Sequence, residues 1–329
     1  MRRWLQRVGP AALGLAATGA LVFVLDPGRV GRALADFRLA LIAPIVVLYL
    51  AIYGLQGVRW HYLLRDAGAR LRLWDSVLLN AAGQTITALV PLGDLTRAVF
   101  ASEASGRDFG TLAATVTVQE LTFNLMLILC ALPVLLAVHL GVAIIVATVI
   151  GMAAIVVILT FSRVFHAVHR LVAHIPLLNR LLPAIDELQM ETADLLHRPD
   201  ALALSVLDLA RALVSIVAFW LVVEGLAPGR LDLPAAAFVL ALASIGGAIS
   251  LIPGGVGANE ASVAGLLIVF GVDDGAAGAA ALIQRVLMSA TALGFGLVAY
   301  AIARRRFHLG GAFQIVTRQP PQTPGPATS

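Results

Sequence analysis

Several charged residues of this sequence lie within long apolar segments, where ionised side chains are rare. Arg97, Glu120, Glu260 and Arg285 are the clearest cases. A charge near the centre of a bilayer costs about 2.5 to 3.5 kcal/mol even on the more lenient insertion scale, so such residues are kept where they face a cavity or a partner. Because a guanidinium group can bind a phosphodiester through its planar fork, the two arginines favour an anionic ligand.

Amide side chains accompany two of these charges. Asn124 follows Glu120 by four residues, so both lie on one face of a helix and can line a polar slot. Gln284 stands beside Arg285, which has no acidic neighbour in its own segment. Its anionic partner is therefore Glu120, Glu260 or a lipid phosphate. Two further charges are expected to neutralise one another as a structural ion pair, being three residues apart: Asp208 and Arg211.

Two apolar segments, 78–99 and 235–270, are broken midway by proline and glycine. A helix that begins in mid-membrane presents the partial positive charge of its N-terminus to an anion. The residues expected to act as hinges are Pro91, Gly93, Pro253, Gly254, Gly255 and Gly257. The polar residues expected to bind substrate beside them are Asp94, Arg97, Asn259 and Glu260. The alternative is that Asp94 and Glu260 only stabilise the starts of their helices.

The two broken segments share a layout that suggests an internal repeat, with halves at residues 39–162 and 201–303. In each, small polar residues lead to an aliphatic pair, then proline, glycine and an acidic residue, and a long segment with polar residues follows. Broken segments in corresponding positions of oppositely oriented halves are typical of a transporter's substrate site. The alternative is that glycine-rich apolar stretches resemble one another in any alanine-rich membrane protein.

The composition fixes the environment of these residues. Of 329 residues, 60% are hydrophobic and 13% are charged, whereas about a quarter are charged in soluble domains. Apolar runs of roughly 20 residues predict an all-α, polytopic helical membrane protein and not a barrel. About six full spans are expected, with the two broken segments as re-entrant hairpins: 9–25, 39–57, 112–140, 142–161, 201–226 and 276–303. Eight or more continuous crossings, with the broken segments kinked but spanning, are the alternative. For the first segment alone, the alternative is a cleaved signal peptide.

Arginine placement predicts the orientation, because basic residues gather on the cytoplasmic side. Both termini are therefore expected in the cytoplasm. The protein is expected to be integral to the cell membrane, with a single transmembrane domain over residues 1–306. Residues 163–200 are expected to form a cytoplasmic amphipathic link, and residues 307–329 a disordered tail. The segment 26–38 is an exception, since it carries three arginines on the face expected outside.

Several kinds of chemistry are excluded by the residues present. All 23 basic residues are arginine, so no lysine can form a Schiff base or serve a Walker loop. Cys130 alone gives neither a disulfide framework nor a cysteine metal cluster. His166, His169 and His174 accompany aliphatic residues in a pattern that favours a surface helix over a metal site. We therefore expect no metal, no cofactor and no catalytic residue, and anionic lipid in place of nucleic acid as the partner of the basic segments.

Five groups of residues together resemble the flippase-like membrane region of the lysylphosphatidylglycerol synthase family, roughly from residue 9 to 306. They are Arg59-Trp60 with Leu63-Leu64, the segment 90–97, the segment 253–261, Phe270-Gly271-Val272 and Arg285. The resemblance implies a protein that moves a polar lipid between leaflets, such as an anionic or aminoacylated phospholipid or a lipid-linked intermediate. Family members often have an arginine directly after the acidic residue and an aspartate one turn later, where this chain has Leu121 and Asn124.

Three functions remain open at this point. The first is lipid translocation, with Arg97, Glu120, Glu260 and Arg285 forming a slot for a head group. The second is a membrane partner or enzyme that handles a lipid head group without moving it, with Glu120 or Glu260 as general base. The third is an ion-coupled solute transporter.

Overall fold

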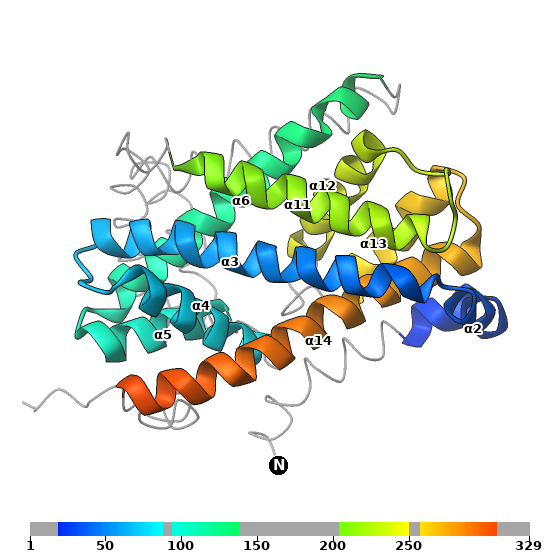
Figure 1. Cartoon of the computed structure of the whole chain (residues 1–329). Helices are drawn as coiled ribbons and strands as arrows, with labels where there is room; N and C mark the ends of the chain where they lie inside the picture. Colours follow the sequence, from blue (N-terminus) through cyan, green and yellow to red (C-terminus); the bar gives the residue numbers. More distant parts are fainter. Residues whose placement is uncertain (1–18, 88–93, 138–203, 250–256, 308–329) are drawn as a thin grey trace, which may run out of the picture.

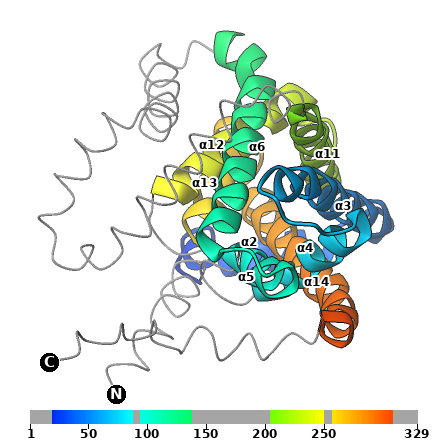
Figure 2. The same cartoon turned by 90° about the vertical axis from the view of Figure 1, so that its left-hand side faces the viewer.

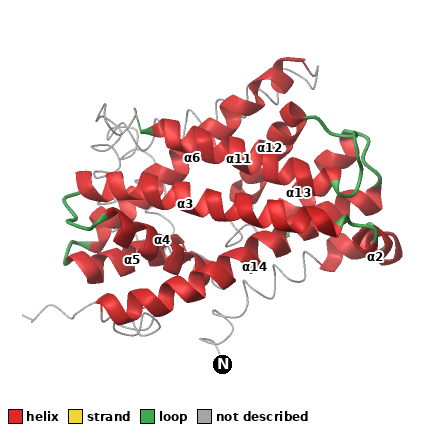
Figure 3. Ribbon diagram, in the orientation of Figure 1, coloured by secondary structure: helices red, strands yellow, loops and turns green. Residues whose placement is uncertain are grey.

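The computed structural model describes residues 19–87, 94–137, 204–249 and 257–307. Within these ranges every regular element is helical, as Figure 3 shows, which confirms the predicted all-α membrane fold. In chain order the elements are α2 (Pro27–Ala35), the short 3-10 helix η1 (Leu39–Leu41), α3 (Ile42–Asp66), α4 (Leu73–Thr87), α5 (Asp94–Ser105), α6 (Phe109–Ala137), α11 (Ser205–Glu224), α12 (Leu233–Ile249), α13 (Ala258–Val269) and α14 (Asp274–Phe307).

Four segments of the described chain are long and apolar enough to cross a membrane: Leu39–Asp66, Phe109–Val134, Ser205–Glu224 and Asp274–Phe307. Each supplies the roughly 20 apolar residues that a bilayer core requires. They correspond to four of the six predicted spans. The predicted span 142–161 and most of the predicted span 9–25 lie outside the described residues.

The two proline-broken segments form pairs of short helices, α4 with α5 and α12 with α13. These helices have 12 to 17 residues, or about 18 to 26 Å at 1.5 Å per residue, against about 30 Å for the bilayer core. In Figure 1 the two members of each pair lie side by side, α4 and α5 towards one end of the molecule and α12 and α13 towards the other. This arrangement agrees with re-entrant hairpins.

Glycine allows the close approach within each hairpin. A Cβ atom at Gly83 of α4 would lie 2.7 Å from the Cβ of Arg97 in α5, and one at Gly246 of α12 would lie 2.5 Å from the Ser262 hydroxyl of α13. The hinge residues Pro91, Gly93, Pro253, Gly254 and Gly255 lie outside the described residues. The remaining predicted hinge, Gly257, directly precedes α13 with a φ of 86°, a backbone conformation that favours glycine.

The described helices pack in a two-fold pattern. α6 packs on α12 in the same way as α14 packs on α4. The helices that begin the two halves, α3 and α11, pack against each other. Figure 1 shows that α3 and α11 run in opposite directions, and Figure 2 shows α5 between α4 and α6. This packing supports the inverted repeat in which α3 to α6 correspond to α11 to α14. The predicted limits of the halves, 39–162 and 201–303, stay a prediction because residues 138–203 are not described.

The core consists of two apolar clusters, one towards each end of the bundle. On α6, residues 112–118 belong to one cluster and residues 127–134 to the other. On α3, the residues from Trp60 onward belong to the first and those up to Tyr53 to the second. Between the clusters, both helices carry buried polar side chains, among them Gln56 and Gln119. A polar layer therefore separates two apolar cores.

Candidate functional site

Glu120 of α6 is the centre of the polar layer. Its carboxylate accepts hydrogen bonds from Nη2 of Arg97 at 2.8 Å and Nε2 of Gln56 at 3.0 Å, and Arg211 approaches it at 3.3 to 3.4 Å. These partners come from α5, α3 and α11, so four helices meet at one carboxylate. Eleven residues of α6 precede Glu120, which places it about 16 Å along a helix that is long enough to cross a bilayer core of about 30 Å. Its side chain is 29% exposed.

Arg97 connects the first hairpin to this carboxylate. Its guanidinium is fully buried and also donates to Oδ1 of Asn80 at 2.8 Å and to Oε1 of Gln119 at 2.9 Å. It stands in the first turn of α5, where the partial positive charge of the helix terminus disfavours a cation. The Glu120 carboxylate and the two amide oxygens offset that cost, so Arg97 and Glu120 depend on each other.

The same layer contains a second, fully buried ion pair. Nε of Arg59 lies 3.0 Å from Oδ2 of Asp208, which also accepts from the Thr122 hydroxyl at 2.7 Å. The prediction that Asp208 would pair with Arg211 is therefore wrong. Spacing along one helix suggested that pair, but α11 packs against both α3 and α6, and the two side chains find partners on different neighbours.

The second half of the chain carries a further ion pair, at the start of α13. Oε1 of Glu260 lies 3.3 Å from Nε of Arg285 on α14, and Oε2 accepts from the backbone N–H of Gly257 at 2.5 Å. Asn259 and Gln284 lie beside the pair and line a small cavity of about 20 Å³ with it. Glu260 thus caps its helix and also pairs with an arginine, while its expected contact with substrate stays a prediction. The sequence left three partners open for Arg285, and in the structure it pairs with Glu260.

The ion pairs Arg97–Glu120 and Glu260–Arg285 occupy equivalent positions with their charges exchanged. Glu120 is the twelfth residue of α6 counted from Phe109, and Arg285 is the twelfth residue of α14 counted from Asp274. Their partners stand in the first turns of α5 and α13. In both pairs the residue on the short helix is buried, whereas the residue on the long helix is 29% or 28% exposed.

A row of polar side chains on α3 runs between the two pairs. The hydroxyl of Tyr49 donates to the Gln284 carbonyl at 3.5 Å, and that of Tyr53 donates to the Met288 carbonyl at 3.1 Å. Gln56 continues the row to Glu120. The three residues follow the four-then-three spacing of one helical face, and the row spans about 10 Å along the axis.

The predicted site residues therefore fall into two groups, around Arg97 with Glu120 and around Glu260 with Arg285. Asn124 lies one turn from Glu120, but its amide donates to the Glu120 backbone carbonyl at 2.7 Å and stays on its own helix. The side chain of Asp94 lies outside the described residues, although its backbone begins α5. Four polar residues that complete the first group were not predicted from the sequence: Gln56, Asn80, Gln84 and Gln119. A fifth, Arg211, was expected to pair with Asp208 and instead joins this group. Their occurrence in apolar helices is the signal that could have found them.

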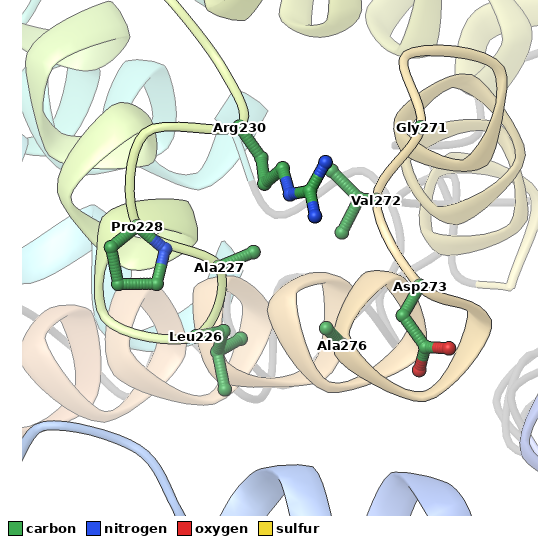
Figure 4. A pocket seen from close by; sticks show the side chains of 8 residues that line it. All are labelled: Leu226, Ala227, Pro228, Arg230, Gly271, Val272, Asp273 and Ala276. Atoms are coloured by element: carbon green, nitrogen blue, oxygen red, sulfur yellow. The ribbon is translucent and has the colours of Figure 1, made fainter.

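A larger cavity of about 440 Å³ lies at one end of the bundle, between the end of α11 and the start of α14. Figure 4 shows Arg230 extending across it towards Val272. Asp273 is on its rim, with a carboxylate that accepts from the Gly275 N–H at 3.0 Å and so caps α14. The predicted site residues are not among those that line this cavity.

Metal binding has no support in the described part of the chain, where no three His, Cys, Asp or Glu side chains are placed to hold an ion. The histidines at positions 166, 169 and 174 belong to the predicted link 163–200, which lies outside the described residues, as does most of the predicted tail 307–329.

Comparison with known proteins decides the family. The family described as "Lysylphosphatidylglycerol synthase TM region" has a sequence model that matches residues 11–301. The chain belongs to this family. The match includes both short-helix pairs and both charge-exchanged ion pairs. A "UPF0104 membrane protein" of Methanothermobacter thermautotrophicus is 24% identical over 307 residues, which cover 86% of this chain and 90% of that protein. No solved structure matches the chain significantly.

In this member of the lysylphosphatidylglycerol synthase TM-region family, Glu120 is followed by Leu121 and pairs with arginines of other helices. Where the resemblance implied an arginine directly after the acidic residue, Glu120 instead receives Arg97 from α5 and Arg211 from α11. The charge of the neighbourhood is thus supplied by other helices.

Proposed function

We propose that this protein moves a lipid with an anionic head group between the leaflets of its membrane. The observation that carries the proposal is the polar layer: two equivalent ion pairs, each beside the start of a short helix and each partly exposed through its long-helix member. Such short helices in oppositely oriented halves are a typical substrate site of transporters.

The layer provides the polar interactions that a head group would lack in the hydrocarbon. Hydrogen-bond donors and charges fixed at mid-depth replace water, while acyl chains stay in the surrounding lipid. The row of Tyr49, Tyr53 and Gln56 joins the two pairs over about 10 Å. Rocking of the two halves would then expose the layer to each side in turn.

An anionic head group suits the charge of the first group. Two guanidinium groups, of Arg97 and Arg211, face the single carboxylate of Glu120. Arginine binds phosphodiesters through paired N–H donors. Anionic phospholipids, aminoacylated phospholipids and lipid-linked intermediates all carry that group, and they are the substrates proposed here.

The proposed transport makes and breaks no covalent bond, so we do not propose an enzymatic activity. Glu120 is held by three side chains, which supports an electrostatic role over that of a general base. No metal, cofactor or nucleic acid is part of the proposal.

The proposed location is the cell membrane, with both termini in the cytoplasm. The end of the bundle where α3 and α14 finish carries seven described arginines, and the opposite end carries four. Basic residues gather on the cytoplasmic side, which supports a cytoplasmic location for the first of these ends.

The test is leaflet exchange of a labelled anionic phospholipid in vesicles that contain the purified protein. Arg285→Ala and Glu260→Gln should each slow exchange at least tenfold. Arg306→Gln is the matched control, because it also removes an arginine that pairs with a carboxylate, Asp75 at 2.8 Å, but lies at the end of the bundle. Absence of exchange in folded parent protein, with anionic, aminoacylated and lipid-linked lipids alike, would refute the proposal.

A further inference from the structure

Among the side chains that the structure describes, the positive charges in and beside the first group exceed the negative charges. Arg97 is neutralised by Glu120 at 2.8 Å and satisfied further by two amides, and Arg59 is neutralised by Asp208 at 3.0 Å. Among the described side chains, Arg211 has only Glu120 as its ion-pair partner, which Arg97 already holds more closely. Arg211 is therefore the surplus cation.

Arg211 has long contacts with its carboxylate partner, and an aromatic ring fixes the plane of its guanidinium group. Its contacts with Glu120 measure 3.3 to 3.4 Å, and within the described structure its buried Nε has no hydrogen-bond partner. Its guanidinium carbon lies 3.9 Å from the centre of the Phe123 ring, an arrangement that holds the plane of the fork. The side chain is 10% exposed. An unused donor on a buried cation is costly unless a ligand uses it.

We infer that Arg211 binds the phosphate of the lipid head group and that its ion pair with Glu120 breaks when it does so. This inference rests on the proposed function and assigns its substrate contact. Glu120 loses little in the exchange, because Arg97 and Gln56 still hold it. Arg97 cannot take the same role, since its side chain is fully buried. The exchange also releases the ion pair that ties α6 to α11, and so couples binding to the contact between the two halves.

The test measures the binding of dioctanoyl phosphatidylglycerol to the full chain in a neutral detergent by calorimetric titration. Dioctanoylglycerol, which lacks the phosphate, and glycerol 3-phosphate, which lacks the acyl chains, are the comparison probes. Arg211→Gln should bind the phospholipid at least tenfold more weakly. Glu120→Gln should bind it several-fold more tightly, because it frees Arg211 while its amide oxygen still accepts from Arg97. Arg306→Gln should leave binding unchanged.

Arg211→Lys keeps a cation but loses the fork, so it should fold normally and bind with intermediate affinity. This variant keeps the test decisive if Arg211→Gln does not fold. The inference is overturned if Arg211→Lys and any folded Arg211→Gln bind as the parent does, or if Glu120→Gln weakens binding. It is also overturned if glycerol 3-phosphate binds as tightly as the phospholipid, since the ligand would then be free phosphate.

The vesicle assay separates this inference from the proposed function. Exchange that needs Arg285 but not Arg211 would leave translocation standing and remove the role of Arg211. Phospholipid binding that needs Arg211, in a protein that exchanges no lipid, would support the inference and remove translocation.

Discussion

The buried pair of Arg59 and Asp208 makes a quantitative prediction about stability. Both side chains are at most 1% exposed, and their contact of 3.0 Å is supported by the Thr122 hydroxyl. Removing one member leaves an uncompensated buried charge, which costs about 3 to 5 kcal/mol. Asp208→Leu should therefore lower the free energy of unfolding by about that amount, as measured by denaturant titration of the purified protein in mixed micelles.

The double variant Arg59→Met with Asp208→Leu tests the reasoning itself. Replacing both charges with apolar side chains of similar size is often neutral or stabilising, so the double variant should regain most of the loss and fall within about 1.5 kcal/mol of the parent. If the double variant is as unstable as Asp208→Leu, the loss comes from packing and not from an unpaired charge. A cost below about 1 kcal/mol in Asp208→Leu would show that water reaches the pair.

Three more predictions follow from the helix contacts. Gly296→Ala should destabilise the protein and slow lipid exchange, because its Cβ would lie 2.8 Å from the Ala81 carbonyl oxygen of α4. The control Gly294→Ala should be neutral or slightly stabilising, because its Cβ would meet nothing within 4 Å. Thermal melting of both variants checks this. Arg285→Glu should place two carboxylates together and destabilise the second pair, and adding Glu260→Arg should restore only part of the stability, because the exchanged charges attract but the cap on the Gly257 N–H is lost; melting of the double variant below that of Arg285→Glu would contradict the pair. Arg306→Gln should cost less than the loss of about 3 to 5 kcal/mol expected for Asp208→Leu in the same micelle titration, since Arg306 is 44% exposed although its partner Asp75 is 8% exposed; an equal loss would mean that the pair is not solvated.

The sequence was sufficient to predict the helical fold and to single out four charged residues of the candidate site. Proline and glycine in apolar segments predicted the two broken elements, and the rarity of charge in membrane helices identified Arg97, Glu120, Glu260 and Arg285. The structure joins these four residues into two pairs.

The partners of these residues were harder to predict, because they depend on how each helix is rotated against its neighbours. The Asp208–Arg211 pair followed the local i, i+3 rule, and the contacts of α11 with two different helices overrode it. Gln56 and Asn80 carry no charge and stand alone in apolar helices, so only the tertiary contacts reveal that they belong to the site. A pattern along one helix cannot encode contacts of this kind.

The exchange of charges between the two ion pairs gives the molecule an electrical direction that its fold lacks. Two halves related by a two-fold axis in the membrane plane would carry opposed dipoles along the membrane normal if their pairs were identical, and these components would cancel. Here the short helix carries the arginine in one half and the glutamate in the other. With such an axis, the components of the two pairs along the normal add, and the two sides of the polar layer are not equivalent in a membrane potential.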